Sequence, residues 1–392
     1  DGRGAPGATL RTIQALHIQL PRWREAGFIF LTLEEWAMER TISRLSWKKG
    51  LFCAFLFTGL LALTAFLFLK DQDLGQLLRV LQQAHVPWLI VGGSCMVFFF
   101  CCEALNIQRG LRIFGSHAPY QSCLRYAITG FFFSSVTPSA SGGQPMQLYD
   151  MYQDGHSPAH GTLALLTEFF SFQLAAVVIA LISFSLYRNE ILSLRHEVWL
   201  LFVVGTALNV VVVLLLAVAV FSPKILPSLW RWLMNLAQKL FPHRAEQWRC
   251  WGEAQLSELH QCAARYRKER LTLLKCFSTS FAQVAAYHSI PYWIALSLGV
   301  TGQSLWEMIA LQSVLFLSVS SLPLPGAVGL SEGGFLIFFR GVFPATMLSA
   351  GMMLSRVVSF YCFLLLAGVF VSTRTVYSFR THAYKKQEGH SS

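Results

Sequence analysis

The chain is dominated by long apolar runs separated by short polar stretches. An α-helix of about 20 apolar residues is long enough to cross the roughly 30 Å of hydrocarbon in a bilayer. Such runs recur along the sequence and predict about six full spans, at residues 50–69, 87–107, 158–187, 198–221, 271–299 and 345–372. The pattern therefore predicts an all-α polytopic membrane protein.

Two further apolar stretches are interrupted where a spanning helix would still lie in hydrocarbon. Residues 120–136 stop at the sequence TPSASGGQP, and residues 305–343 contain the break SLPLPGAVGLSEGG. Prolines and glycines at these positions do not continue a helix. We expect each stretch to be a re-entrant hairpin, a pair of short helices that enters and leaves on one side. The alternative is a pair of unrelated kinks that neighbouring helices tolerate.

Charge sets the expected orientation of these segments. Apolar residues make up 54% of the chain, charged residues only 13%, and the net charge is +11. The stretch 222–270 holds nine Lys or Arg against four Glu, which places it in the cytoplasm by the positive-inside rule. Cations before the first span and after the last place both termini there too. The short loop 300–305 is then outside.

This orientation divides the chain into five parts. The sequence predicts an N-terminal amphipathic cytoplasmic segment, a first membrane repeat, a basic amphipathic loop, a second membrane repeat and a cytoplasmic tail. Their bounds are residues 1–47, 48–221, 222–270, 271–375 and 376–392.

The two membrane parts follow the same plan. In the first, 26 residues separate Gly142 in the break from Glu168 in the following span, and in the second, 27 residues separate Gly329 from Arg356. With the orientation above, the two units run in opposite directions. Inverted repeats of this kind place a substrate site among broken helices near the midplane of the membrane. The sequence therefore predicts re-entrant hairpins in inverted repeats.

Charged residues inside spans are costly and usually mark a site or a pathway. Glu168 and Arg356 lie about ten residues inside their spans and are the main candidates. Glu332 is expected to accept hydrogen bonds from free backbone N–H groups or to meet an ammonium group. Glu103 and Lys275, near span ends, are expected to reach the headgroups instead.

The breaks supply backbone groups as well as turns. An exposed helix N-terminus near Gly143 favours a lipid phosphate. The candidate substrate-binding residues at the breaks are Pro138, Gly142, Gly143, Pro325, Gly326 and Gly329. The alternative for these prolines and glycines is simple turn formation.

The motifs SSVTPSASGGQPMQLYDMYQDGHSP and SLPLPGAVGLSEGG, together with the spans that carry Glu168 and Arg356, resemble a known family over residues 48–375. This is the lysylphosphatidylglycerol synthase transmembrane (flippase) domain, the membrane half of the bacterial multiple peptide resistance factor. The resemblance implies a flippase that moves an aminoacylated or related phospholipid between leaflets of the bacterial cytoplasmic membrane. Because the sequence ends about 20 residues after its last span, we expect no fused synthase domain.

Other functions are weighed against this one. An integral membrane transferase would use Glu168 or Glu332 as a general base, and a non-catalytic partner of a separate synthase would use the same helices without transport. No nucleotide-binding, metalloprotease or serine-hydrolase motif occurs, so no cofactor is expected. His156 and His160 lack a third ligand at metal spacing. We expect a phospholipid substrate and an anionic membrane surface as partners, no nucleic acid, and a separate aminoacyl-lipid synthase or a homo-oligomer as further candidates.

Overall fold

The computed structural model describes residues 75, 79, 82–137, 142–188, 196–221, 269–320 and 329–374. All of them belong to one compact unit, Thr64–Leu226 with Glu258–Ser392. This described part is helical, with no strand. The predicted span 50–69, the N-terminal segment, most of the basic loop and the C-terminal tail lie outside the described residues.

Four helices in the described part are long and apolar enough to cross a membrane. They are α5 (Val86–Ile113), α8 (Pro158–Leu186), α10 (His196–Phe221) and the last helix, which runs over Ala345–Arg374 and comprises α17 (Ala345–Arg356), η3 (Val357–Tyr361) and one further stretch. Large apolar side chains such as Ile90, Leu215 and Leu366 stay exposed on them. Such outward apolar faces suit a hydrocarbon solvent, and they confirm the membrane class.

Prolines set several of the helix boundaries. α5 and α8 each carry a proline in the first two positions, where the missing N–H is not needed. Pro291 divides the predicted span 271–299 into α13 (Arg270–His288) and α14 (Ile290–Ser297), because a proline cannot continue the hydrogen-bond ladder. This predicted single span is therefore two helices that meet at Ser289.

Both predicted hairpins are present as pairs of short helices. The first pairs α6 (Tyr120–Val136) with α7 (Gly143–Gln153), and the second pairs α15 (Leu305–Ser320) with α16 (Leu330–Phe338). The end of α15 lies beside the middle of α10, where Asn209 Nδ2 donates to Ser320 Oγ over 3.2 Å. The end of α15 therefore reaches the middle of α10, as the re-entrant hypothesis expects.

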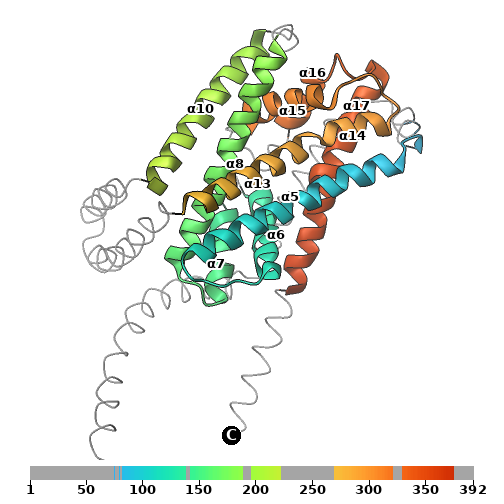
Figure 1. The fold of residues 1–392 in the computed structure, drawn as a ribbon. Coiled ribbons are helices and arrows are strands. Elements are labelled where there is room, and N and C mark those ends of the chain that lie inside the picture. The colour runs from blue at the N-terminus through green and yellow to red at the C-terminus, as the bar shows by residue number, and fades with distance from the viewer. Residues whose placement is uncertain are drawn as a thin grey trace, which may run out of the picture. The chain divides into compact units, whose positions relative to one another are not determined.

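The hairpins open at opposite ends of the last helix (Figure 1). In α7, Asp150 contacts Arg374, the final residue of that helix. At the other end, Phe343, which follows α16, packs against Gly351 near the start of the same helix. Opposed openings are what the inverted-repeat hypothesis requires.

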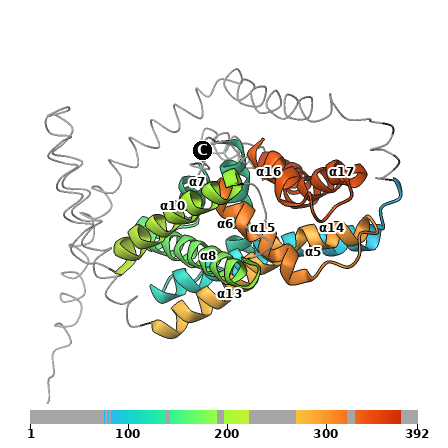
Figure 2. The same cartoon turned by 90° about the horizontal axis from the view of Figure 1, so that it is seen from above.

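The two largest of four buried clusters in the described residues hold most of the unit together. The larger one joins α8, α10 and α13 to α17, and the smaller one joins α5, α6, α7 and α8. Figure 2 shows α10, α8 and α13 side by side, with α16 and α17 grouped apart from them next to α14. The helix α8 contributes to both clusters and so connects the first hairpin to the second.

Candidate functional site

The second hairpin begins its returning helix with a glycine in a left-handed backbone conformation. Gly329 is the N-cap of α16 and has φ +87°, a backbone conformation that glycine adopts without steric cost. Its N–H donates to Oε2 of Glu332, three residues later, over 2.6 Å. The carboxylate thus occupies one of the N–H groups that a helix start leaves without a partner. The expectation that Glu332 accepts from the free backbone is confirmed.

The other oxygen of Glu332 binds the last helix. Arg356 Nε donates to Glu332 Oε1 over 2.7 Å, and the hydroxyl of Tyr361 donates to the same atom over 3.2 Å. The side chains of Glu332 and Arg356 are 3% and 11% exposed, so this is a buried ion pair. The acidic partner that the structure gives Arg356 is therefore in the second hairpin.

A short π-helix explains why Arg356 and Tyr361 reach one carboxylate. In an α-helix, residues five apart point about 140° away from each other around the axis. Residues 357–361 form a π-helix, whose hydrogen bonds join residues five apart and bring them nearer to one side. The guanidinium also lies over the ring of Phe360, with 4.7 Å from Cζ to the ring centroid. The π-helix thus builds a cage of one carboxylate and two aromatic rings around the Arg356 cation.

Glu168 lies on the face of α8 that packs against α5. Four residues before it, Ala164 meets Gly110 of α5, and four residues after it, Phe172 contacts Phe99 of α5 with 5.9 Å between ring centroids. Residues four apart share one side of a helix. Glu168 therefore faces the part of α5 that lies between Phe99 and Gly110.

That part of α5 carries a second acid, Glu103. Its Oε1 accepts a hydrogen bond from Gln147 Nε2 of α7 over 2.8 Å. The two carboxylates are close enough to repel each other, and both side chains are half-buried. In the described residues, no hydrogen bond or ion pair involves the Glu168 carboxylate. The expectation that Glu103 reaches the headgroup region is wrong, because its carboxylate turns inward to α7 and Glu168.

The glycines of the first break allow two helices to approach closely. A Cβ added to Gly143 would lie 1.9 Å from Ser134 Oγ and 2.7 Å from the carbonyl oxygen of Gly130 on α6. The N–H of Gly142 donates to Thr137 Oγ1 over 2.9 Å. These contacts give Gly142 and Gly143 a structural role in closing the hairpin. Pro138, Pro325 and Gly326 lie outside the described residues.

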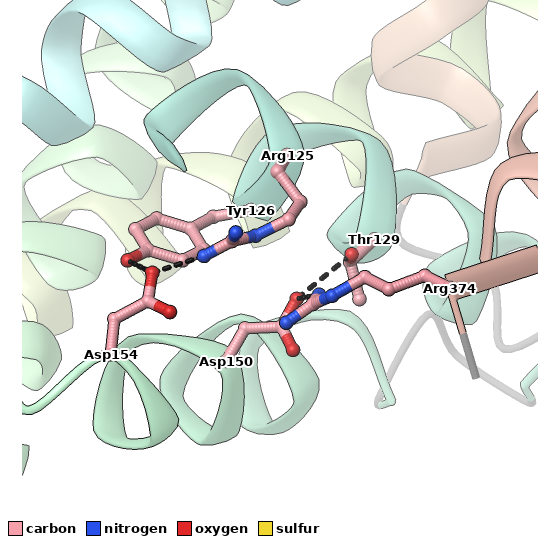
Figure 3. A network of polar contacts seen from close by, with 6 residues as sticks. All are labelled: Arg125, Tyr126, Thr129, Asp150, Asp154 and Arg374. Atoms are coloured by element: carbon pink, nitrogen blue, oxygen red, sulfur yellow. Dashed lines mark hydrogen bonds and ion pairs between the residues drawn. The ribbon is translucent and has the colours of Figure 1, made fainter. Parts of the chain in front are cut away.

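An ion network fixes the open end of the first hairpin (Figure 3). Asp154 pairs with Arg125 and accepts from the hydroxyl of Tyr126, while Asp150 accepts from Thr129 Oγ1 over 3.0 Å and from Arg374 over 2.6 Å. Asp150 and Asp154 are four apart on the α7 side, as Arg125 and Thr129 are on α6. This matched spacing of the acids and their partners is the sequence pattern from which the network could have been predicted. It gives no indication that Arg374 takes part.

The helices and their inward charges together define a class: a polytopic α-helical integral membrane protein with ionised groups buried between re-entrant and spanning helices. The sequence model of one family, the lysylphosphatidylglycerol synthase TM region, matches residues 51–368. The chain therefore belongs to this family. A search of curated proteins finds no match.

Proposed function

We propose that this protein moves a phospholipid with a cationic, aminoacylated headgroup between the leaflets of a bacterial cytoplasmic membrane. The observation that carries the proposal is a pair of opposite charges inside the helix bundle. Arg356 presents a buried cation on the last helix, and Glu168 presents a carboxylate without a hydrogen-bond or ion-pair partner in the described residues. A headgroup with both a phosphate and an ammonium carries the complementary charges.

Arg356 would bind the phosphate. A guanidinium has five N–H donors in a planar fork that matches a phosphate, and its Nε donates to Glu332. Glu332, which accepts from Gly329, Arg356 and Tyr361, then orients the guanidinium instead of meeting the substrate ammonium itself. The start of α7 at Gly143 is a further phosphate-binding position in this proposal, since helix N-termini attract anions.

Glu168 would bind the ammonium of the aminoacyl group, with Glu103 beside it. Tyr287 lies near Arg356 and Glu332, and its ring contacts Phe99 of α5 at 5.6 Å between centroids. A headgroup that extends past Tyr287 would have both its ends satisfied. This matters because an unpaired polar group costs several kcal/mol in hydrocarbon.

The orientation in the membrane is part of the proposal. The cytoplasmic side would hold both termini, the loop 222–270 and the open end of the first hairpin at Asp150 and Arg374. The second hairpin would then open from outside, and the two hairpins would form the inverted repeats. The protein would act as a translocator and not as an enzyme, on lipid supplied by a separate synthase.

Translocation of fluorescent lipids in liposomes tests the proposal. We expect Glu168→Gln and Arg356→Gln each to slow translocation of an aminoacylated lipid at least about tenfold, the effect of a loss near 1.4 kcal/mol. Glu269→Gln, the same chemical change at an exposed position, should translocate like the wild type. Wild-type rates in both test variants would contradict the proposal.

The runner-up function, a membrane transferase, is favoured by one observation: a carboxylate without a partner, such as Glu168, also suits a general base. The same liposomes separate the two functions when their lipids are extracted afterwards. Translocation leaves the lipid chemically unchanged, whereas a transferase produces a new lipid species.

A further inference from the structure

Gln283 on α13 is buried without hydrogen bonds. Its side chain is 0% exposed, and neither Nε2 nor Oε1 has a partner. Within the described part of the chain, no other side chain leaves two buried polar atoms in this state. Buried polar groups are nearly always hydrogen-bonded, and leaving one without a partner costs about 1–3 kcal/mol. The amide of Gln283 therefore indicates a ligand that the protein atoms do not supply.

Contacts on either side of Gln283 show where its amide points. On α13, Ser280 precedes it by three residues and Tyr287 follows it by four, so the three share one face. Ser280 Oγ accepts from Asn106 of α5 over 2.9 Å, and Tyr287 contacts Phe99 of α5. Gln283 therefore faces the part of α5 between Phe99 and Asn106.

Glu103 occupies that same part of α5. It follows Phe99 by four residues and precedes Asn106 by three, so it lies on the face that meets α13. Glu168 reaches the same level from α8, because its neighbours Ala164 and Phe172 meet α5 on either side of it. Two carboxylates and one buried amide from three helices thus face the same region of the bundle.

Packed side chains flank this region on two sides. Phe99, Phe172 and Tyr287 form an aromatic layer on one side, with centroid distances of 5.9 and 5.6 Å. Asn106 closes the other side by donating to Ser280 Oγ and to the carbonyl oxygen of Cys276. We call the region between them, which contains Glu103, Glu168 and Gln283, the acidic compartment.

The neighbouring charges leave the acidic compartment negative. Arg109 is the nearest cation of α5, but its Nη1 donates to Thr279 Oγ1, to the carbonyl oxygen of Lys275 and to Asn106, below the compartment. The other polar neighbours of the acidic compartment are Gln147 of α7, which is neutral, and the thiol of Cys276 and the hydroxyl of Tyr287 on α13. None of these groups supplies a positive charge between the two carboxylates.

We propose that Glu103, Glu168 and Gln283 form a binding site for one small monovalent cation, Na⁺ or a proton. Carboxylate and amide oxygens are the ligands that hard cations prefer, and one positive charge between two carboxylates removes their repulsion. The amide oxygen of Gln283 would complete the site. Binding of this cation goes beyond the proposed lipid translocation and does not depend on it.

One consequence does rest on the proposed function. If the lipid ammonium binds Glu168, it would displace the small cation from the acidic compartment, since both neutralise the same carboxylates. Movement of the lipid would then be coupled to the cation, without any nucleotide hydrolysis.

Thermal unfolding of the purified full-length protein in detergent, without lipid substrate, tests the site. Na⁺ is titrated against N-methyl-D-glucamine at constant ionic strength, and the Na⁺-free protein is also measured across a range of pH. A ligand that binds the folded state raises Tm as its concentration rises. We expect Tm to rise by several degrees with Na⁺, or in its absence to rise as the pH falls.

Direct binding and variants separate the two cations. Saturable binding of radioactive Na⁺ to the wild type, lost in Glu168→Gln and weakened about tenfold in Gln283→Leu, would assign the site to Na⁺, because a tenfold change corresponds to about 1.4 kcal/mol, the scale of one ligand contact. A pH-dependent Tm that is insensitive to Na⁺ and lost in Glu103→Gln or Glu168→Gln would assign it to the proton. Glu269→Gln should keep either response.

A wild-type protein whose Tm responds to neither Na⁺ nor pH, and which binds no radioactive Na⁺, would overturn the proposal, and this result does not depend on whether any variant folds. Because lipid is absent, a failure of lipid translocation would leave this result standing, and the reverse also holds.

Discussion

Removing the charge of Glu332 should destabilise the protein strongly. Glu332→Gln leaves the Arg356 guanidinium, whose side chain is 11% exposed, without the carboxylate at 2.7 Å. Breaking a buried ion pair by removing one partner costs about 3–5 kcal/mol, because the remaining charge is buried without compensation. The variant keeps an amide oxygen that accepts from Gly329, so the loss reports the ion pair and not the helix cap. We therefore expect about 3–5 kcal/mol less free energy of unfolding.

A double-mutant cycle isolates the pair from its surroundings. Arg356→Gln should also cost several kcal/mol, whereas the double variant should cost clearly less than the two single variants together, with a coupling of about 2 kcal/mol or more. The free energy of unfolding is measured by titrating SDS into mixed micelles. Arg125 and Asp154, whose side chains are 24% and 28% exposed, provide the matched pair, with an expected coupling of about 0.2–1 kcal/mol.

Equal couplings for the buried and the outer pair would refute this reasoning. So would a loss below about 1 kcal/mol in Glu332→Gln, because it would mean that water or lipid reaches the guanidinium. A small loss in Glu332→Gln would also contradict the claim that the Arg356 guanidinium is shielded from solvent, and the proposed phosphate site depends on that claim.

Three further outcomes are expected. Gly143→Ala should destabilise the protein by about 1–3 kcal/mol, because its Cβ would lie 1.9 Å from Ser134 Oγ, whereas Gly93→Ala, with nothing within 4 Å of the added Cβ, should be neutral or stabilising in thermal unfolding. Tyr361→Phe should cost about 0.5–1.5 kcal/mol by losing its hydrogen bond to the buried carboxylate over 3.2 Å, measured in the same unfolding titration. A cysteine introduced in the loop 300–305 should react with a membrane-impermeant maleimide from outside intact cells. Reaction only after lysis would contradict the predicted orientation and support the opposite one.

The spanning helices were predictable because each is a long apolar run, and the hairpins because proline and glycine interrupt such runs. Arg356 and Glu332 were recognisable as charges in apolar surroundings. Their pairing was not, because the π-helix at 357–361 turns Tyr361 and Arg356 toward one carboxylate and has no distinct sequence pattern. Helix periodicity places residues on a face only if the helix stays regular.

Contacts between residues far apart in the sequence, and the roles of uncharged residues, could not be predicted from the sequence. Asp150 and Arg374 are 224 residues apart and meet only because the first hairpin packs on the end of the last helix. Glu103 was expected near the headgroups because it lies toward the end of the predicted span 87–107, but α5 continues to Ile113 and places this carboxylate inside. Gln283 carries no charge and so gave no signal, although its burial without partners stands out in the structure.

The central claim is that Glu168 recognises a positively charged headgroup. The most direct measurement is the ratio of translocation rates for lysyl-phosphatidylglycerol and unmodified phosphatidylglycerol, both with fluorescent acyl chains, in liposomes that contain the purified protein. The account predicts faster translocation of the lysyl lipid by the wild type and a ratio near one in Glu168→Gln, with Glu269→Gln keeping the wild-type ratio. Equal rates for the two lipids in the wild type would contradict it.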